Sequence, residues 1–341
     1  MIMDMDKWVQ SVLTSRRRLA IPLMTHPGIA LTGRSVLDAV TSSQHHYEAV
    51  KALAEKYPTA ASTMIMDLSI EAEAFGAQIR FDEHEVPSVA ARMVTNRDEI
   101  DRLEVPSISH GRLRQRIAAT EQAAQYITDR PVFAVCIGPF SLAARLFDVS
   151  ETMMATLLEP ESIMRLTGTC TQFLITYCQH LKSAGANAVI IAEPVAGMVS
   201  RDLCTQFSSS FIAEIVCAVQ DSHFKVILHN CGETDTLLLS MQGTGAAALH
   251  FGAKCNLPQA LAQLPEDLLI MGNLDPVGVL RMGQPDYVRN ETRWLLEETA
   301  AHKNFILSSG CDVPPSTPPE NIDAFFGALD DFNRQQTAKS S

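Results

Sequence analysis

Three residues of the types that bind zinc stand out in this sequence. His229 and Cys231 are separated by one residue in the run His229-Asn230-Cys231, and Cys311 occurs later in the run SSGCDVPPSTPPEN. Side chains on a β-strand repeat every two residues, so the imidazole and the first thiol leave the backbone on the same face. Two sulfurs and one imidazole nitrogen form a zinc site with a fourth position open, as catalytic sites require. We therefore predict that these residues bind Zn²⁺ and that a thiol substrate occupies the open position. An ordinary strand histidine beside a buried cysteine is the alternative interpretation.

The composition narrows the class of protein. The chain has 341 residues, of which 46% are hydrophobic and 19% are charged, and this balance is typical of a globular core. The 39 acidic and 27 basic residues give a formal net charge of −12, which opposes binding to nucleic acid or to an anionic membrane. We expect no nucleic-acid partner.

The N-terminus and the cysteines indicate a cytoplasmic location. The first residues have acids ahead of a basic cluster and no apolar run of signal-peptide length, and we expect no membrane-spanning segment further along. The eight cysteines are irregularly spaced, with no C-x-x-C pair, unlike a secreted disulfide framework. A reducing compartment would leave the thiols free to bind a metal.

Short apolar segments rich in β-branched residues alternate with helical patterns along the chain, which predicts parallel βα units. Eight such segments fit a closed barrel covered by helices, so we predict a (β/α)8 TIM barrel. The predicted strands are residues 19–26, 63–67, 131–138, 188–194, 226–231, 246–251, 268–274 and 305–311.

The barrel is expected to be one domain over residues 1–341, with an insertion around 78–109 and a frayed tail at 334–341. Helices are predicted between the strands, several of them opening with Pro, Ser, Thr or Asp. Their ranges are 35–57, 110–127, 160–184, 201–220, 285–301 and 318–332.

Polar residues occur at the ends of most predicted strands, where active sites of this fold lie. Besides the three metal ligands they are Asp67, Glu193, His250, Asn273 and Asp275. A polar residue at a strand end can also simply cap the strand and face water. We assign Asp67 and Glu193 to catalysis, and His250, Asn273 and Asp275 to substrate binding.

Several motifs together resemble the uroporphyrinogen decarboxylase superfamily over nearly the whole chain. They are GPFSLAARL (138–146), GANAVIIAEPVAG (185–197), HNCGET (229–234), MGNLDPVGVL (271–280) and SSGCDVPPSTPPENI (309–322). This resemblance implies a (β/α)8 barrel in one of two branches. One branch contains metal-free decarboxylases of uroporphyrinogen. The other contains zinc methyltransferases that move a methyl group from a methylated corrinoid to a thiol, typically coenzyme M.

The residues favour the methyltransferase branch. The decarboxylases carry an M-R-Q-A-G-R pattern after the first strand, whose arginines bind the substrate's carboxylates, whereas this chain reads Met24-Thr25-His26-Pro27-Gly28-Ile29. His229, Cys231 and Cys311 match the zinc ligands of the methyltransferases, and MDLSIEAEAFG (66–76) resembles their segment after the second strand. The alternative is a metal-free decarboxylase of a uroporphyrinogen-like acid, supported by the shared barrel and by Asp67, which stands where the decarboxylases have their key aspartate.

The resemblance leaves the fourth zinc ligand open. Some methyltransferases use a carboxylate from a barrel strand, but the sixth predicted strand has His250-Phe251-Gly252 with no acid. The position then falls to His250, Glu193 or water, and a hydrogen-bonded core histidine is the alternative for His250.

A methylated corrinoid, such as methylcobalamin, is implied as the methyl donor and has to come from a separate corrinoid protein. Corrinoid carriers use a D-x-H-x-x-G motif, and the nearest match here, at 221–226, ends in Val226 in place of Gly. A third interpretation is a non-catalytic corrinoid-binding protein. The identity of the methyl acceptor stays open between coenzyme M, another small thiol, homocysteine and a folate. The upstream methyl source and the oligomeric state stay open as well.

Overall fold

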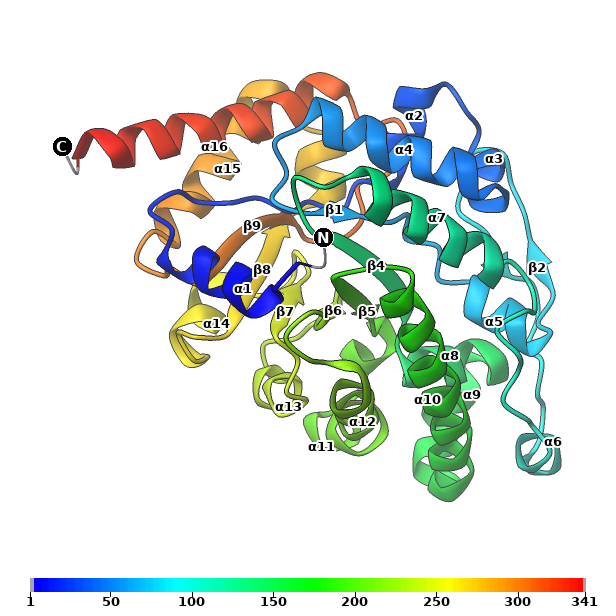
Figure 1. The fold of residues 1–341 in the computed structure, drawn as a ribbon. Helices are drawn as coiled ribbons and strands as arrows, with labels where there is room; N and C mark the ends of the chain where they lie inside the picture. The colour runs from blue at the N-terminus through cyan, green and yellow to red at the C-terminus, as the bar shows by residue number, and fades with distance from the viewer. Residues whose placement is uncertain (1–2, 340–341) are drawn as a thin grey trace.

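Seven parallel strands form a curled sheet at the centre of the structure, a computed structural model that describes residues 3–339 (Figure 1). The sheet order is β1-β4-β5-β6-β7-β8-β9, and every neighbouring pair is parallel. The strands are β1 (Ser62–Thr63), β4 (Val132–Ile137), β5 (Ala188–Ala192), β6 (Lys225–Asn230), β7 (Ala248–Phe251), β8 (Leu269–Leu274) and β9 (Phe305–Ser309). Helices surround the sheet, as in the TIM-barrel class that the sequence predicted.

The first predicted strand, residues 19–26, is wrong in its second half. Helix α2 (Thr25–Thr32) begins inside it, and only Ala20 makes a parallel bridge, to Leu307 of β9. Pro22 has no N–H group to continue a ladder, which explains why regular pairing stops there. The segment still lies between the two edges of the sheet, because the Ile21 amide donates to the Leu307 carbonyl (2.9 Å) and the Ala60 amide donates to the Ala20 carbonyl (2.9 Å).

The strands carry two hydrophobic faces. Side chains on one face form a core inside the curled sheet: Phe133, Val135, Ala188, Ile190, Ile227, Ala248, Leu269, Met271 and Ile306. The alternate side chains pack against the helices: Ala134, Cys136, Val189, Ile191, Leu228, Leu249, Phe251, Ile270 and Leu307. This double burial explains why the strands read as continuous apolar runs.

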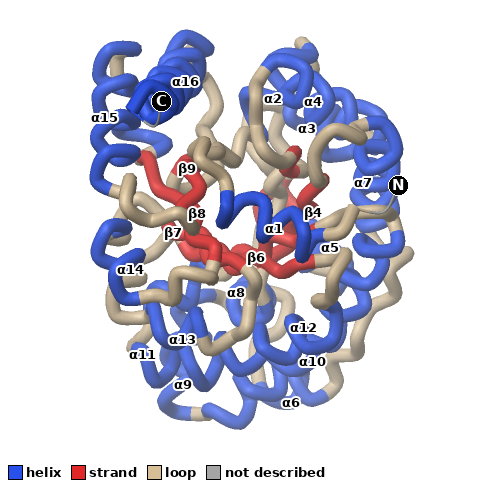
Figure 2. Tube along the Cα trace, turned by 60° about the vertical axis from the view of Figure 1, so that its left-hand side comes forward, coloured by secondary structure: helices blue, strands red, loops and turns tan. Residues whose placement is uncertain are grey.

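Helix α1 (Met5–Thr14) covers the N-terminal end of the inner core and crosses the ring of strands in Figure 2. Asp4 caps this helix by accepting a hydrogen bond from the Lys7 amide (3.0 Å). Trp8 packs edge-on against Phe133 of β4, with 5.7 Å between ring centroids. The N-terminal end is thus closed by apolar side chains, which leaves the C-terminal end for a site.

The predicted helices are present with shifted ends. The range 35–57 is divided into two helices at Ser42, which ends the first and accepts a hydrogen bond from the His45 amide (3.3 Å) at the start of the second. The helices before β5 are α3 (Val36–Thr41), α4 (Ser43–Lys56), α5 (Ile70–Phe75), α6 (Arg97–Asp101), α7 (Leu113–Tyr126), α8 (Pro139–Phe147), α9 (Val149–Leu158) and α10 (Pro160–Ser183). The later elements are η1 (Pro194–Met198), α11 (Arg201–Cys204), η2 (Thr205–Ser209), α12 (Ser210–Val219), α13 (Leu238–Gln242), α14 (Leu257–Gln263), η3 (Pro276–Arg281), α15 (Pro285–Glu298) and α16 (Pro319–Lys339).

Three segments refine the expectations from sequence. The stretch 78–109 contains an antiparallel pair, β2 (Ile79–Arg80) with β3 (Ser88–Val89), followed by α6. The expected frayed tail is helical as far as Lys339, and residues 340 and 341 lie outside the described part. We expected no membrane-spanning segment, but the continuous helical stretch Arg201–Val219 has the length and composition of one. Half of its most apolar window is buried inside the fold.

Removal of the aromatic ring of Phe133 should destabilise the barrel. The side chain is 1% exposed and supports α1 through Trp8, so we expect Phe133→Ala to lower the free energy of unfolding by about 3–5 kcal/mol. Urea denaturation would measure the change. Leu158→Ala, at a position that is 78% exposed, is the matched control, and an equal loss in both variants would contradict this account of the core.

Candidate metal centre

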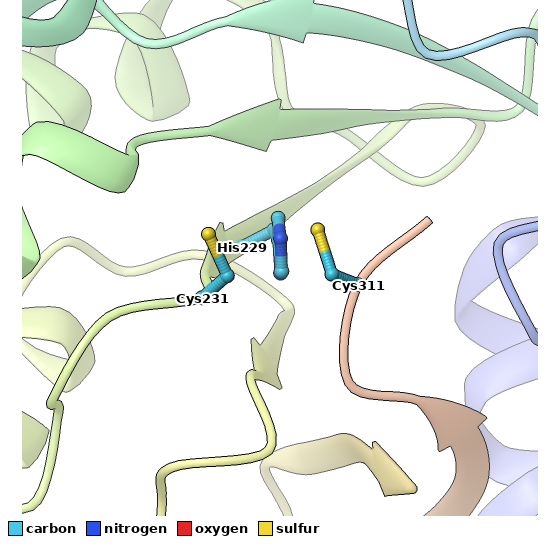
Figure 3. Close-up of side chains that lie close together, drawn as sticks. All are labelled: His229, Cys231 and Cys311. Atoms are coloured by element: carbon cyan, nitrogen blue, oxygen red, sulfur yellow. The ribbon is translucent and has the colours of Figure 1, made fainter. Parts of the chain in front are cut away.

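His229, Cys231 and Cys311 meet at the C-terminal end of the sheet. One ring nitrogen of His229 and the two sulfur atoms all lie within 4.8 Å of one another, and His229 lies between the two cysteines in Figure 3. His229 lies near the end of β6 and is 1% exposed, whereas both cysteines are partly exposed. A tetrahedral zinc ion with bonds of about 2.0–2.3 Å holds its ligand atoms roughly 3.3–3.8 Å apart, so the three atoms need to close by no more than about 1.5 Å to bind one ion. The three atoms therefore form a nitrogen–sulfur–sulfur set that is open to solvent on the sulfur side.

The pKa values of the two cysteine thiols are shifted in opposite directions. The pKa of Cys231 is lowered to about 4, first because of hydrogen bonding from the Cys311 thiol and then because of hydrogen bonding from His229, although burial opposes the shift. The pKa of Cys311 is raised far above its ordinary value by the same pairing and by burial. Metal ligands must be deprotonated, so a divalent cation would fit here by displacing the proton of Cys311. The donor set thus suits the predicted ion.

Asn230 fixes the loop that carries Cys231. Its side-chain amide donates to the Glu193 carbonyl at the end of β5 (2.8 Å), and its side-chain oxygen accepts from the Gly232 amide (2.8 Å). The residue between the two ligands therefore points away from them and holds the loop to the neighbouring strand.

Two glycines let the loops after β6, β7 and β9 pass close together. A Cβ atom at Gly252 would lie 2.5 Å from the Cys231 Cα, and one at Gly310 would lie 2.5 Å from the Ala253 nitrogen. Contacts this close require glycine, whatever the neighbouring side chains do. The Cys311 loop can therefore approach the Cys231 loop only through the backbone of residues 252 and 253.

The other side of the Cys311 loop is held by the segment before α2. The carboxylate of Asp312 accepts a hydrogen bond from the Thr25 amide (2.8 Å), and the Val313 amide donates to the Leu23 carbonyl (2.8 Å). Burial raises the pKa of Asp312 to about 7. Cys311 is thus fixed from both sides before any metal binds.

His250 lies directly behind His229. The two residues are partners in the β6–β7 register, and their Nδ1 atoms are 2.8 Å apart. The Nε2 atom of His250 is 2.8 Å from the hydroxyl of Ser308 on β9. Burial, and then the neighbouring His229, lower the pKa of His250 well below its ordinary value. Both ring nitrogens are engaged and the residue is 0% exposed, so in this arrangement His250 offers no atom to a substrate or to a metal.

Glu193 follows β5, but its carboxylate binds the start of α8. It accepts hydrogen bonds from the amides of Phe140 (3.2 Å) and Ser141 (2.6 Å), and burial raises its pKa to about 7. The side chain is 1% exposed. The structure therefore places Glu193 at a helix N-terminus, where an anion is stabilised, and outside the metal cluster.

Asp67 is held in a buried ion pair. One carboxylate oxygen lies 2.5 Å from the Arg112 guanidinium, and the other accepts from the Ser69 amide and hydroxyl (3.0 and 2.7 Å). Arg112 also binds Glu73 (2.7 Å). The carboxylate thus has its partners within the protein, and the arginine that neutralises it comes from the N-terminus of α7.

Asn273 and Asp275, predicted to bind substrate, stabilise the turns after β7 and β8, respectively. The Asn273 amide donates to the carbonyls of Gly252 (3.0 Å) and Cys255 (2.8 Å), and Asp275 caps η3 by accepting from the amides of Val277 and Gly278. The side chain of Asn273 therefore stabilises the turn at Gly252, which lies against the backbone of Cys231.

Sequence reasoning missed Ser308, Arg112 and Asp312. The inward direction of Ser308 could have been predicted from the sequence. Ser308 is two positions beyond the inward-facing Ile306 on the same strand and so points into the barrel. Arg112 is far from Asp67 in sequence and carries no local signal. Among the described residues, the cluster consists of these three ligand atoms and includes no carboxylate.

Comparison with known proteins places this fold in a family. The sequence model of the uroporphyrinogen decarboxylase family matches residues 18–332, so the chain belongs to this family, and the resemblance recognised in the sequence is confirmed. A solved methyltransferase from Methanosarcina mazei superposes with a TM-score of 0.86 at 23% identity, covering 94% of this chain and 97% of that one. That likeness establishes the fold.

Two curated relatives represent the two branches. A protein named methylcobamide:CoM methyltransferase MtbA, from Methanosarcina acetivorans, is 26% identical over 317 residues, which are 88% of this chain and 91% of the relative. A uroporphyrinogen decarboxylase from Neisseria meningitidis is 24% identical over 314 residues, which are 88% and 86% of the two chains.

The metal-free protein should contain a thiolate at unusually low pH. We expect the ultraviolet absorbance of a thiolate to develop as the pH rises through about 4, because the Cys231 thiolate accepts hydrogen bonds from Cys311 and His229. Cys231→Ser should abolish this step, and Cys311→Ala should move it to higher pH because the principal donor is lost. Cys217→Ser, which removes an exposed thiol outside the cluster, should leave it unchanged. A step that persists in Cys231→Ser would refute the assignment.

Proposed function

We propose that this protein is a zinc-dependent methyltransferase that moves a methyl group from a methylated corrinoid, carried by a separate corrinoid protein, to a small thiol such as coenzyme M. The observation that carries the proposal is the convergence of His229, Cys231 and Cys311 within 4.8 Å at the open end of the barrel. The similarity to the Methanosarcina methyltransferases supports the reaction class.

The residues of the site suit a thiol acceptor. Zinc, when bound, lowers the pKa of a coordinating thiol so that the substrate reacts as its thiolate. The two cysteine thiolates neutralise the charge of the ion, which leaves the substrate sulfur electron-rich. The partly exposed side of Cys231 and Cys311 gives that sulfur access to the open position. In the transfer, a bond forms between the sulfur and the methyl carbon while the cobalt–carbon bond breaks, and its electron pair stays on cobalt.

The other predicted polar residues receive supporting roles in this proposal. Asp67 is bound to Arg112 and keeps the loop after β1 in place. Glu193 is bound to the start of α8 and keeps the loop after β5 in place. Asn273 and Asp275 hold the turns after β7 and β8. We further propose a single barrel domain over residues 1–341, completed by the segment 19–23 as an eighth strand, with 78–109 as an insertion. A cytoplasmic role in one-carbon metabolism is part of the same proposal.

The decarboxylase alternative has less support. The helix that begins at Thr25 carries His26 in the segment where decarboxylases have arginines for the substrate carboxylates. A cysteine thiolate beside a second thiol would have no function in a metal-free decarboxylation. The Neisseria relative shows only that both branches share the family with this chain.

Zinc analysis and a methyl-transfer assay test the proposal together. The purified protein should contain roughly one zinc ion per chain. It should also consume methylcobalamin in the presence of one member of a thiol panel, with loss of the methyl–cobalt absorbance as the readout. Cys231→Ser and Cys311→Ser should lose the metal and the transfer, whereas Cys217→Ser should keep both.

Three results would contradict the proposal. Full zinc content and full transfer in Cys231→Ser would show that the cluster is not the metal site. A zinc-containing protein that consumes no methylcobalamin with any thiol would favour the non-catalytic interpretation, and a zinc-free protein that decarboxylates a uroporphyrinogen-like acid would favour the other branch.

A further inference from the structure

A chain of hydrogen bonds leads from the metal ligand His229 into the barrel wall. Ser308 donates its hydroxyl proton to the Ile21 carbonyl (2.7 Å). A hydroxyl has a single proton, so the same oxygen can only accept from the Nε2 atom of His250, 2.8 Å away. His250 must therefore carry its ring proton on Nε2.

The direction of the next bond follows from this. A neutral His250 with its proton on Nε2 has a lone pair on Nδ1, and that atom lies 2.8 Å from the Nδ1 atom of His229. The His250 carbonyl, which can only accept, lies 3.3 Å from the same atom of His229. Two acceptors thus face the Nδ1 atom of His229, which keeps its proton there. When a metal replaces the proton that His229 directs at Cys231, the lone pair of Nε2 is left for the ion.

We propose that His250 and Ser308 are positioning residues that fix the ring tautomer and orientation of His229 for metal binding. All three side chains are at most 1% exposed, so no solvent can supply the missing partner if one of them is removed. The inference rests on the proposed function in that it takes His229 to be a metal ligand.

The barrel offers a matched control for the hydroxyl. Ser309, next to Ser308 on β9, is equally buried, and its hydroxyl accepts a hydrogen bond from the Leu23 amide (3.0 Å). Ser309→Ala therefore removes a hydroxyl bonded to the same N-terminal segment without touching the two histidines. A loss specific to Ser308→Ala would come from the histidine chain and not from a weaker barrel wall.

A pair of variants at His250 separates packing from hydrogen bonding. In His250→Gln the amide oxygen can accept from His229 and the amide nitrogen can donate to Ser308, so both directions are kept. His250→Leu fills similar space and removes both. If the ring of His250 only filled space, His250→Gln would bind zinc no better than His250→Leu.

The test measures zinc affinity by competition with a chromophoric chelator, and the ring proton of His229 by ¹⁵N NMR of histidine-labelled, zinc-loaded protein. We expect Ser308→Ala and His250→Leu to bind zinc about 10- to 100-fold more weakly. Ser309→Ala and His250→Gln should stay near wild type. In the wild-type protein, Nδ1 of His229 should be protonated and Nε2 should be metal-bound, and thermal unfolding should show which variants are folded.

The outcomes distinguish this inference from the proposed function. Failure of the wild-type protein to bind zinc would overturn both. If wild-type protein binds zinc, then equal affinities in Ser308→Ala and Ser309→Ala, or metal on Nδ1 of His229, overturn the positioning role alone and leave the methyl-transfer proposal intact.

Discussion

The close approach of three loop backbones is the constraint on which the metal centre depends. The loops after β6, β7 and β9 are in contact at Gly252 and Gly310, where any side chain would collide with the neighbouring main chain. This contact brings the sulfurs of Cys231 and Cys311 together although they lie on strands separated by β7 and β8. Once they are together in a partly buried place, the neighbouring Cys311 and His229 lower the pKa of Cys231, so that a thiolate lies among the three candidate ligands.

The interior of the sheet changes character along its axis, and the change explains why the site lies at one end. Apolar residues such as Ile227, Ala248 and Ile306 fill the middle, and α1 closes the N-terminal end. Two residues further along the same strands, the inward positions are His229, His250 and Ser308. Buried polar groups must be paired. This layer satisfies its own members and leaves one ring nitrogen directed at the cysteines, so it separates the dry core from the reactive end.

Much of this arrangement could be predicted from the sequence, because strand periodicity is local information. The spacing of His229 and Cys231 fixes their common face, and the order of apolar segments places Cys311 at the same end of the barrel. Three features could not be obtained in this way. The role of His250 depends on cross-strand register, and Arg112 reaches Asp67 from a distant helix. The carboxylate of Glu193 turns toward α8, a choice set by orphan amide groups at a helix start that strand patterns do not report. Strand ends identify the mouth of a barrel, whereas the direction of each side chain there is decided by its neighbours.

The same barrel mouth serves two chemistries within this family, and the residues show what separates them. A decarboxylase has to bind several carboxylates, which requires unpaired cations around the opening. Here Arg112 is already neutralised by Asp67 and Glu73, and the start of α2 carries no arginine. The charge available at the mouth is instead the thiolate of Cys231, which repels an anionic substrate unless a cation is bound. In the proposed enzyme a divalent cation would therefore do more than activate a thiol. It would neutralise the negative charge of the two cysteine sulfurs, which would otherwise oppose the approach of an anionic acceptor.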